Sequence, residues 1–177
     1  FSVYLRSPSW QQYQNGWGGE ANRVSGTKHD GVYTVDITIP KHAEPGTWVV
    51  NAVWMRDGVG NYDMPYTAEL AGAGLPTEFT VIDPDPDMDV AQLPELSFAP
   101  TSVDVSAGAQ DVTFTMRITD NLSGLRYCGV TLASPTTLHR VNAWLPLAAI
   151  TSPLDDTYSL AVTIPQHVEP GTWDVEA

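Results

Sequence analysis

The chain has 177 residues, and its 8 basic and 21 acidic residues give a formal net charge of −13 at pH 7. Nucleic acids and anionic membrane surfaces attract clusters of Lys and Arg, so this charge argues against both as partners. No run of about 18 apolar residues occurs, so the sequence predicts no membrane insertion.

Cysteine usage narrows the chemistry further. Cys128 is the single cysteine, which excludes an internal disulfide and a zinc cluster built from thiolates. It lies in the apolar run 125–132, so we expect it to pack inside a core. Cysteine scarcity fits a cytosolic protein and equally fits bacterial surface proteins that avoid disulfides.

The predicted elements are strands, because the hydrophobic pattern has a period of two. Apolar and polar residues alternate through residues 33–39, 112–119 and 158–164, and the apolar ones are mostly β-branched or aromatic. Residues 66–72 could form one helical turn and no more. Short strands at regular spacing with turn signals between them predict an all-β fold of antiparallel sandwiches.

Alternating Asp and Pro residues between Ile82 and Val90 mark a joint. Such a segment cannot pair in a sheet and favours extended polyproline II structure, so it reads as a semi-rigid spacer. We therefore divide the chain into residues 1–83, an acidic Asp/Pro linker at residues 84–93, and residues 94–177.

An internal repeat relates the two halves. Residues 38–48 recur 125 positions later as residues 163–173, and residues 3–8 match residues 130–135. Both copies contain Glu-Pro-Gly-Thr-Trp, in which Pro followed by Gly favours a type II turn. A repeat this long is a whole domain and not a solenoid unit.

The phase of the repeat predicts that each copy is only partly covered. The first half is then the C-terminal part of one repeat, and the second half is the N-terminal part of the next. A missing strand would leave backbone donors and acceptors unpaired along a sheet edge. Three explanations stay open: an ordered part of a longer chain, a proteolytic fragment, or neighbouring chains that complete each other by strand addition.

Several motifs, taken in order, resemble the bacterial immunoglobulin-like repeats of secreted and cell-surface proteins. They are residues 103–108, 119–124, 56–61 and 78–81, together with the Ser-Pro and Glu-Pro-Gly-Thr-Trp motifs. The resemblance implies tandem immunoglobulin-like sandwiches in an extracellular or cell-surface protein. It also implies a stalk, adhesin, surface-layer module or accessory domain of a secreted enzyme, with neighbouring repeats or identical chains as partners.

No catalytic signature stands out. The Gly-x-Ser-x-Gly, His-Glu-x-x-His, P-loop and dinucleotide patterns do not occur. His42 and His167 are equivalent positions of the repeated turn, which indicates a structural role. We therefore expect no enzyme activity, and the leading hypothesis is a non-catalytic extracellular structural module.

Calcium is the one cofactor that the sequence suggests. Asp57 and Asn61 lie in one short loop, and Asp120 and Asn121 lie in another, with the hard oxygen ligands that calcium prefers. The competing interpretation is that these side chains simply stabilise turns. A weaker candidate is the linker, whose carboxylates would otherwise be a solvated spacer: Asp83, Asp85, Asp87 and Asp89.

Aromatic residues suggest an alternative function. Trp10, Tyr13 and Trp17 alternate with amide side chains in a Gly-bearing stretch, and stacking faces beside amides suit carbohydrate or surface binding. The competing interpretation is an exposed strand that crosses onto the sheet. The repeated tryptophans are expected to pack in the core. They are the pairs Trp17 and Trp144, and Trp48 and Trp173.

Overall fold

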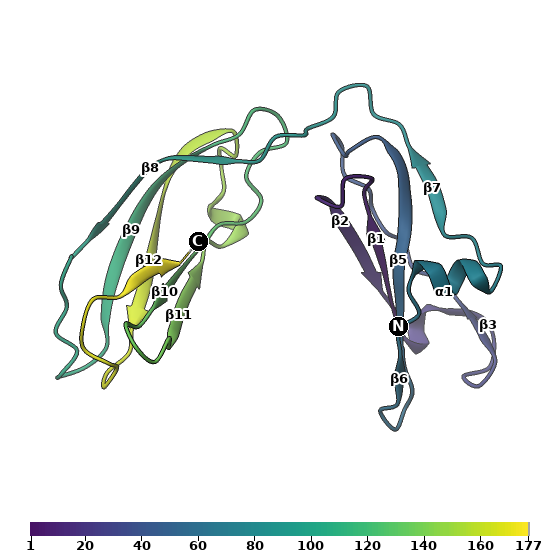
Figure 1. The fold of residues 1–177 in the computed structure, drawn as a ribbon, viewed down its shortest axis with the longest axis horizontal. Helices are drawn as coiled ribbons and strands as arrows, with labels where there is room; N and C mark the ends of the chain where they lie inside the picture. Colours follow the sequence, from purple (N-terminus) through teal and green to yellow (C-terminus); the bar gives the residue numbers. More distant parts are fainter. Residues whose placement is uncertain (177) are drawn as a thin grey trace. The chain divides into compact units, whose positions relative to one another are not determined.

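The computed structural model describes residues 1–176, and the chain separates into two compact units. Unit 1 comprises residues 1–88, and unit 2 begins at residue 89 (Figure 1). Both units consist mainly of antiparallel strands, which confirms the all-β prediction. Among the described residues, no helix has the length and apolar character that crossing a membrane would require.

Unit 1 is centred on the long strand β5 (Gly46–Arg56). Strand β1 (Ser2–Arg6) pairs with one edge of β5, and β7 (Glu78–Val81) and β6 (Tyr62–Asp63) pair with the other. Strand β2 (Tyr13–Trp17) pairs with β1 and ends the sheet. The remaining elements are the 3-10 helix η1 (Glu20–Asn22), the hairpin β3 (Arg23–Gly26) and β4 (Gly31–Tyr33), and helix α1 (Thr67–Gly72).

The core of unit 1 gathers around Trp48. Its side chain is completely buried, and its ring lies 6.3 Å from that of Phe79 on β7. Leu5 on β1 is buried beside it, because alternate residues of neighbouring strands point to the same side of the sheet. Ala43, in the turn before β5, is buried in the same cluster. Strand β7 therefore pairs with one edge of β5, and its apolar side chains cover this core.

Unit 2 contains two sheets that share one core. In the first sheet, β9 (Gln110–Thr119) lies between β8 (Gln92–Ala99) and β12 (Asp155–Ile164). In the second sheet, β10 (Gly129–Ala133) lies between β11 (Arg140–Trp144) and β13 (Asp174–Glu176). The 3-10 helix η2 spans Leu147–Ala149. The buried side chains of both sheets form a single cluster, as in a sandwich.

Cys128 packs at the side of that cluster, as predicted, although it is only partly buried. Its thiol lies 3.8 Å from the Met116 sulfur, and burial raises the pKa of the thiol. The cysteine is therefore a packing residue with a weakly reactive thiol.

Two of the three predicted strands are confirmed. Residues 112–119 lie in β9 and residues 158–164 lie in β12, and these two strands pair along the whole length of β12. The prediction for residues 33–39 is wrong, because only Tyr33 belongs to a strand and residues 34–39 join no ladder in the described chain. The burial of side chains still alternates along this segment, although it pairs with no strand in the described chain. Val35, Ile37 and Ile39 are half-buried and their neighbours are exposed.

Part of the acidic joint is attached to unit 1. The Asp83 carboxylate accepts the His42 backbone N–H at 2.8 Å, and the Asp87 N–H donates to the His42 carbonyl oxygen at 2.9 Å. Gln12 donates its side-chain amide to the Asp87 carbonyl oxygen at 3.2 Å. Residues 83–87 therefore follow the surface of unit 1, and the division between the units falls after Met88.

Candidate functional site

The repeated turn has the same geometry in both units. The Ser7 hydroxyl is buried and accepts the Gln12 N–H at 3.1 Å, and the buried Ser134 hydroxyl accepts the His139 N–H at 2.9 Å. Each serine N–H also donates to the backbone carbonyl of the same partner residue. A short loop of equal length is thereby fixed in both units.

A glutamate from the repeated motif ties each loop down. The Glu44 carboxylate accepts the Ser9 N–H at 2.9 Å and the Ser9 hydroxyl at 2.7 Å. The Glu169 carboxylate accepts the Thr137 N–H at 3.1 Å and the Thr137 hydroxyl at 2.8 Å, and it also binds the Thr136 hydroxyl. These carboxylates are acceptors in structural hydrogen bonds and not free bases.

The same contacts lower the pKa of both glutamates. Hydrogen bonds from the Thr136 hydroxyl and from the Thr137 N–H and hydroxyl lower the pKa of Glu169 to about 2. Burial by itself would raise the pKa of Glu44, but hydrogen bonds from Ser7 and Ser9 outweigh it and the pKa lies below its usual value. Both side chains are therefore ionised at neutral pH.

A tryptophan side chain donates a hydrogen bond to the backbone of each turn. The Trp48 indole N–H donates to the Glu44 carbonyl oxygen at 2.8 Å, and that of Trp173 donates to the Glu169 carbonyl oxygen at 3.0 Å. The residue after the proline must be glycine, because Gly46 has φ of 122° and Gly171 has φ of 135°. We call this arrangement the turn clamp. It comprises Ser7, Glu44, Gly46 and Trp48 in unit 1, and Ser134, Glu169, Gly171 and Trp173 in unit 2.

The repeated histidines lie next to the turn clamp. His42 and His167 both have φ of 65°, the left-handed region. The His42 ring nitrogen Nδ1 lies 2.6 Å from the Asp85 carbonyl oxygen, which attaches the acidic joint to the turn. This contact is structural and brings no nucleophile to the histidine.

The first calcium candidate stabilises its own hairpin. Asp57 accepts the backbone N–H groups of Val59 and Asn61 at 3.0 and 2.9 Å, and its second oxygen accepts the Asn61 side-chain amide at 2.7 Å. The Asn61 side chain is the main cause of a lowered pKa for Asp57. The Asn61 amide nitrogen, and not the amide oxygen that could bind calcium, therefore lies next to the Asp57 carboxylate.

The second loop behaves in the same way. Asp120 accepts the N–H groups of Leu122 and Gly124 at 3.1 and 2.6 Å. The Asn121 amide donates to the Asp89 carboxylate at 2.7 Å, within unit 2. Within residues 1–176, no three His, Cys, Asp or Glu side chains gather in an arrangement that could hold a metal ion.

The four linker carboxylates, which were the weaker calcium candidate, are divided between the two units. Asp83, Asp85 and Asp87 belong to unit 1, and Asp89 belongs to unit 2. The Asp83 carboxylate accepts the His42 N–H and, at 2.9 Å, the Asp85 N–H, so it also acts as a turn-forming acceptor. Asp87 is buried against unit 1.

The predicted binding residues are all exposed. The exposed fractions are 58% for Trp10, 61% for Tyr13 and 78% for Trp17. Tyr13 and Trp17 lie four residues apart on β2 and therefore point to the same side of the sheet, away from the buried Leu5. The Arg6 guanidinium lies 5.2 Å from the centre of the Tyr13 ring.

Two more aromatic residues join this side of the sheet. Trp17 is opposite Ser2 on β1, and Ser2 is opposite Trp54 on β5. Tyr4 lies two residues from Ser2 on β1, so it points to the same side. We call Tyr4, Tyr13, Trp17 and Trp54 the aromatic face. Sequence reasoning missed Tyr4 and Trp54, although Tyr4 stands between the apolar residues Val3 and Leu5, a pattern that indicates an outward side chain.

The prediction for the repeated tryptophans is correct for one pair and wrong for the other. Trp48 is fully buried and Trp173 is partly buried. Trp17 and Trp144 are 78% and 65% exposed, because each is the last residue of a strand whose alternate positions point away from the core. Repetition alone therefore did not distinguish a core residue from a surface residue.

Comparison of the chain with protein-family models, with curated proteins and with solved structures finds no match.

Proposed function

We propose that the chain is a non-catalytic structural module of an extracellular or cell-surface protein, composed of two immunoglobulin-like repeats in tandem. The observation that carries this proposal is the turn clamp, whose serine, glutamate, glycine and tryptophan recur at equivalent positions in both units with equivalent serine and tryptophan hydrogen bonds. A site for one ligand would not need to be duplicated, whereas a repeated architectural unit must reproduce the bonds that fold it.

The strand register around the clamp supports the same conclusion. Arg6 is opposite Val49 and Leu5 is opposite Val50 in unit 1. The repeat-equivalent pairs in unit 2 have the same register: Ala133 opposite Asp174, and Leu132 opposite Val175. Two units that share motif, bonds and register suit a stalk or spacer, with neighbouring repeats or identical chains as partners.

A carbohydrate-binding function is the second candidate, and the aromatic face favours it. The Tyr13 and Trp17 rings are exposed, and the Tyr4 and Trp54 rings on the same side of the sheet are half-buried. With Asn15 between Tyr13 and Trp17, this side combines stacking surfaces with an amide. The equivalent positions of Tyr13 and Tyr4 in unit 2 are Arg140 and Thr131. The face is therefore a property of unit 1 and not of the repeat, as expected for an acquired site or for an accessory domain of a secreted enzyme.

A binding survey distinguishes the two functions. The chain and its Tyr13→Ala, Trp17→Ala double variant are tested against a panel of soluble glycans and insoluble polysaccharides. A structural module gives no saturable binding in either protein. Saturable binding that the double variant loses while it keeps its circular dichroism spectrum would instead establish the carbohydrate-binding function.

A matched control is available in unit 2. Trp144 is the repeat equivalent of Trp17 and is similarly exposed, but it has no aromatic neighbours at the equivalents of Tyr13 and Tyr4. If the aromatic face binds carbohydrate, Trp17→Ala lowers the affinity and Trp144→Ala leaves it unchanged. Equal losses in both variants would indicate nonspecific stacking on any exposed tryptophan.

A further inference from the structure

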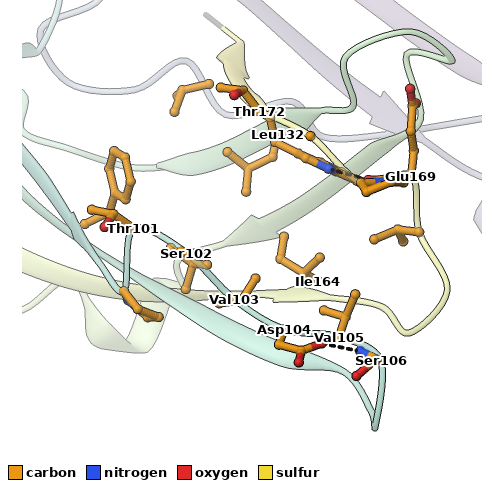
Figure 2. A pocket seen from close by; sticks show the side chains of 18 of the residues that line it. Thr101, Ser102, Val103, Asp104, Val105, Ser106, Leu132, Ile164, Glu169 and Thr172 are labelled. Carbon is orange, nitrogen blue, oxygen red and sulfur yellow. Dashed lines mark hydrogen bonds between the residues drawn. The ribbon is translucent and has the colours of Figure 1, made fainter.

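Unit 2 identifies the two sides of the repeated sheet. Leu132 on β10 and Ile164 on β12 belong to one buried cluster and line the same cavity, so this side of β10 faces the core (Figure 2). Trp144, at the end of β11, is on the opposite side and is 65% exposed. The equivalent of Leu132 in unit 1 is Leu5, which is buried in the core cluster. The aromatic face of unit 1 therefore corresponds to the solvent-facing side of the repeated sheet.

A fifth aromatic residue extends the aromatic face beyond β5. Ala52 on β5 is opposite Tyr4 on β1, and at its other edge it forms a bridge with Tyr66. The bridge continues the register of the β5–β6 ladder, in which Met55 is opposite Asp63. Residues directly opposite one another in a sheet point to the same side. Tyr66, which is 52% exposed, therefore points to the same side as Tyr4.

The aromatic residues form two rows that cross the strands. Each row has one small residue between two aromatic residues: Trp17, Ser2 and Trp54 in the first row, and Tyr4, Ala52 and Tyr66 in the second. Neighbouring strands lie about 4.8 Å apart, so the Cα atoms of the two aromatic residues in a row are about 10 Å apart. Each row therefore holds two rings that are separated by a strand.

The rings of the aromatic face do not pack against one another. In the part of the chain that the structure describes, the ring pairs in contact all lie elsewhere: Phe1 with Tyr33, Trp48 with Phe79, Phe98 with Phe114, and His139 with Trp173. A cage around one cationic group requires several rings that converge on it. Separated rings on one side of a sheet instead suit a ligand that has several flat units in series.

Trp17 is more accessible than its repeat equivalent for a structural reason. In unit 2, a methyl group on Gly129 would lie 2.6 Å from the Cε3 atom of Trp144, so that ring covers Gly129. Ser2 is the equivalent of Gly129 in unit 1, and its side chain occupies this space. The Trp17 ring therefore cannot cover the neighbouring strand in the same way, and it is 78% exposed.

The two rows carry polar groups but no charge. Ser2 lies within the first row, and the exposed Asn15 is opposite Tyr4 at the end of the second row. Neither row contains a charged side chain, and the net charge of −13 on the whole chain repels polyanions. Arg6 is next to the second row, where its guanidinium lies over the Tyr13 ring. Hydroxyl and amide groups beside stacking surfaces match the hydroxyl groups and flat faces of an uncharged sugar.

We propose that the aromatic face and Tyr66 bind an uncharged β-1,4-linked polysaccharide, and that its successive sugar rings stack on Trp17 and Trp54. Linkages of this type give a straight, flat backbone, which suits separated rings in a row. The polysaccharide crosses β2, β1 and β5 along the first row, and Asn15 forms hydrogen bonds with its hydroxyl groups. This inference rests on the carbohydrate-binding candidate named above and specifies its ligand as an oligomer that needs at least two linked sugars.

Calorimetric titration of the full chain with sugars of increasing length tests the proposal. The probes are the monosaccharides, disaccharides and hexasaccharides of β-1,4-linked glucose, mannose and N-acetylglucosamine. A β-1,4-linked mannuronate hexasaccharide is the charged control, because it has the mannose backbone with a carboxylate on each ring.

We expect at least one uncharged hexasaccharide to bind saturably, and about tenfold or more tightly than its monosaccharide, because only the longer sugar reaches both tryptophans. The mannuronate hexasaccharide should bind more weakly than the best uncharged probe, because the acidic chain repels it.

Three variants locate the site. Trp17→Ala and Trp54→Ala should each weaken hexasaccharide binding by about tenfold, because each removes one of the two stacking positions. The gain in affinity from monosaccharide to hexasaccharide should largely disappear in both variants. Trp54 is half-buried, so if Trp54→Ala unfolds, the more exposed Tyr66→Ala serves instead. Trp144→Ala in unit 2 is the control and should leave the affinity unchanged.

Four results would overturn the proposal. They are no saturable binding of any uncharged hexasaccharide, equal affinity for monosaccharide and hexasaccharide, tighter binding of the mannuronate, and unchanged affinity in the folded Trp17→Ala variant. A concentration-dependent dimer that Trp17→Ala abolishes and no sugar dissociates would also overturn it, because a second copy would then cover the aromatic face.

This inference and the proposed functions can fail separately. Equal affinity for monosaccharide and hexasaccharide keeps the carbohydrate-binding function and removes only the extended ligand. Absence of binding to every sugar removes both, and the chain then remains a structural module.

Discussion

The Trp48 indole N–H lies 2.8 Å from the Glu44 carbonyl oxygen, and this bond is completely enclosed in unit 1. The equivalent bond in unit 2 joins Trp173 to Glu169, but the Trp173 side chain is only partly buried. The two hydrogen bonds therefore compare the same motif in a buried and in a partly exposed environment.

We expect Trp48→Phe to lower the free energy of unfolding of unit 1 by about 1–3 kcal/mol, because the buried Glu44 carbonyl loses its donor. Trp173→Phe should cost less, because water can reach the partly exposed site. Urea denaturation of both variants measures the difference. Trp17→Phe is the control, and a change beyond about 0.5 kcal/mol there would show that ring replacement itself matters.

Glycine at the turn clamp is required by both conformation and space. A methyl group on Gly46 would lie 3.0 Å from the Pro8 Cγ atom, and one on Gly171 would lie 2.9 Å from the Pro135 Cγ atom. With their positive φ angles, we expect either Gly→Ala change to cost about 1–3 kcal/mol. Thermal unfolding of both variants measures this cost.

Gly108→Ala is the matched control for the two clamp glycines. No atom lies within 4 Å of a methyl group at Gly108, and its φ is not in the left-handed region. Its melting temperature should equal that of the parent chain or exceed it slightly. Equal losses at Gly46 and Gly108 would show that the clamp geometry does not select glycine.

Local pattern was enough to predict strands 112–119 and 158–164, because each finds its partner within the same unit. The same pattern failed for residues 33–39, since a strand also needs a neighbour that is distant in sequence. The outward position of Trp17 and the contribution of Trp54 to the aromatic face depend on strand register. Register is a tertiary property that alternation in one segment does not determine.

Hydrogen exchange should reveal the segment that joins no ladder. The amides of residues 35–39 have no strand partner in the described part of the chain, whereas residues 159–164 pair with β9. We expect residues 35–39 to exchange faster by about one order of magnitude or more. Equal protection in the two segments would mean that another strand covers residues 35–39 in solution.

The stability of unit 2 should depend on pH through Glu169. Its pKa is about 2 in the folded unit, below its ordinary value of 4.5, so the ionised side chain stabilises the fold at neutral pH. This contribution is complete above pH 4.5 and is lost as the pH falls from 4.5 through about 2. Unfolding measured across that window should show a weaker pH dependence in Glu169→Gln than in the parent chain. Identical slopes would contradict the role of the carboxylate in the clamp.

Calcium should leave the stability of the chain unchanged. The Asp57 and Asp120 carboxylates already accept hydrogen bonds within their own loops, and calcium would have to replace those bonds. We expect the same melting temperature in chelator and in millimolar calcium. A melting temperature that rises with calcium concentration would establish a linked site, and Asp57→Ala and Asp120→Ala would then locate it.

Mechanical extension of single molecules tests the structural role most directly. A module that sets spacing must keep its length under tension, and two units with separate cores must unfold separately. When the chain is pulled from its ends, we predict two discrete unfolding events, each releasing on the order of 300 Å of extended chain. Gradual lengthening without discrete events, or one event that releases the whole chain, would contradict the proposed structural role.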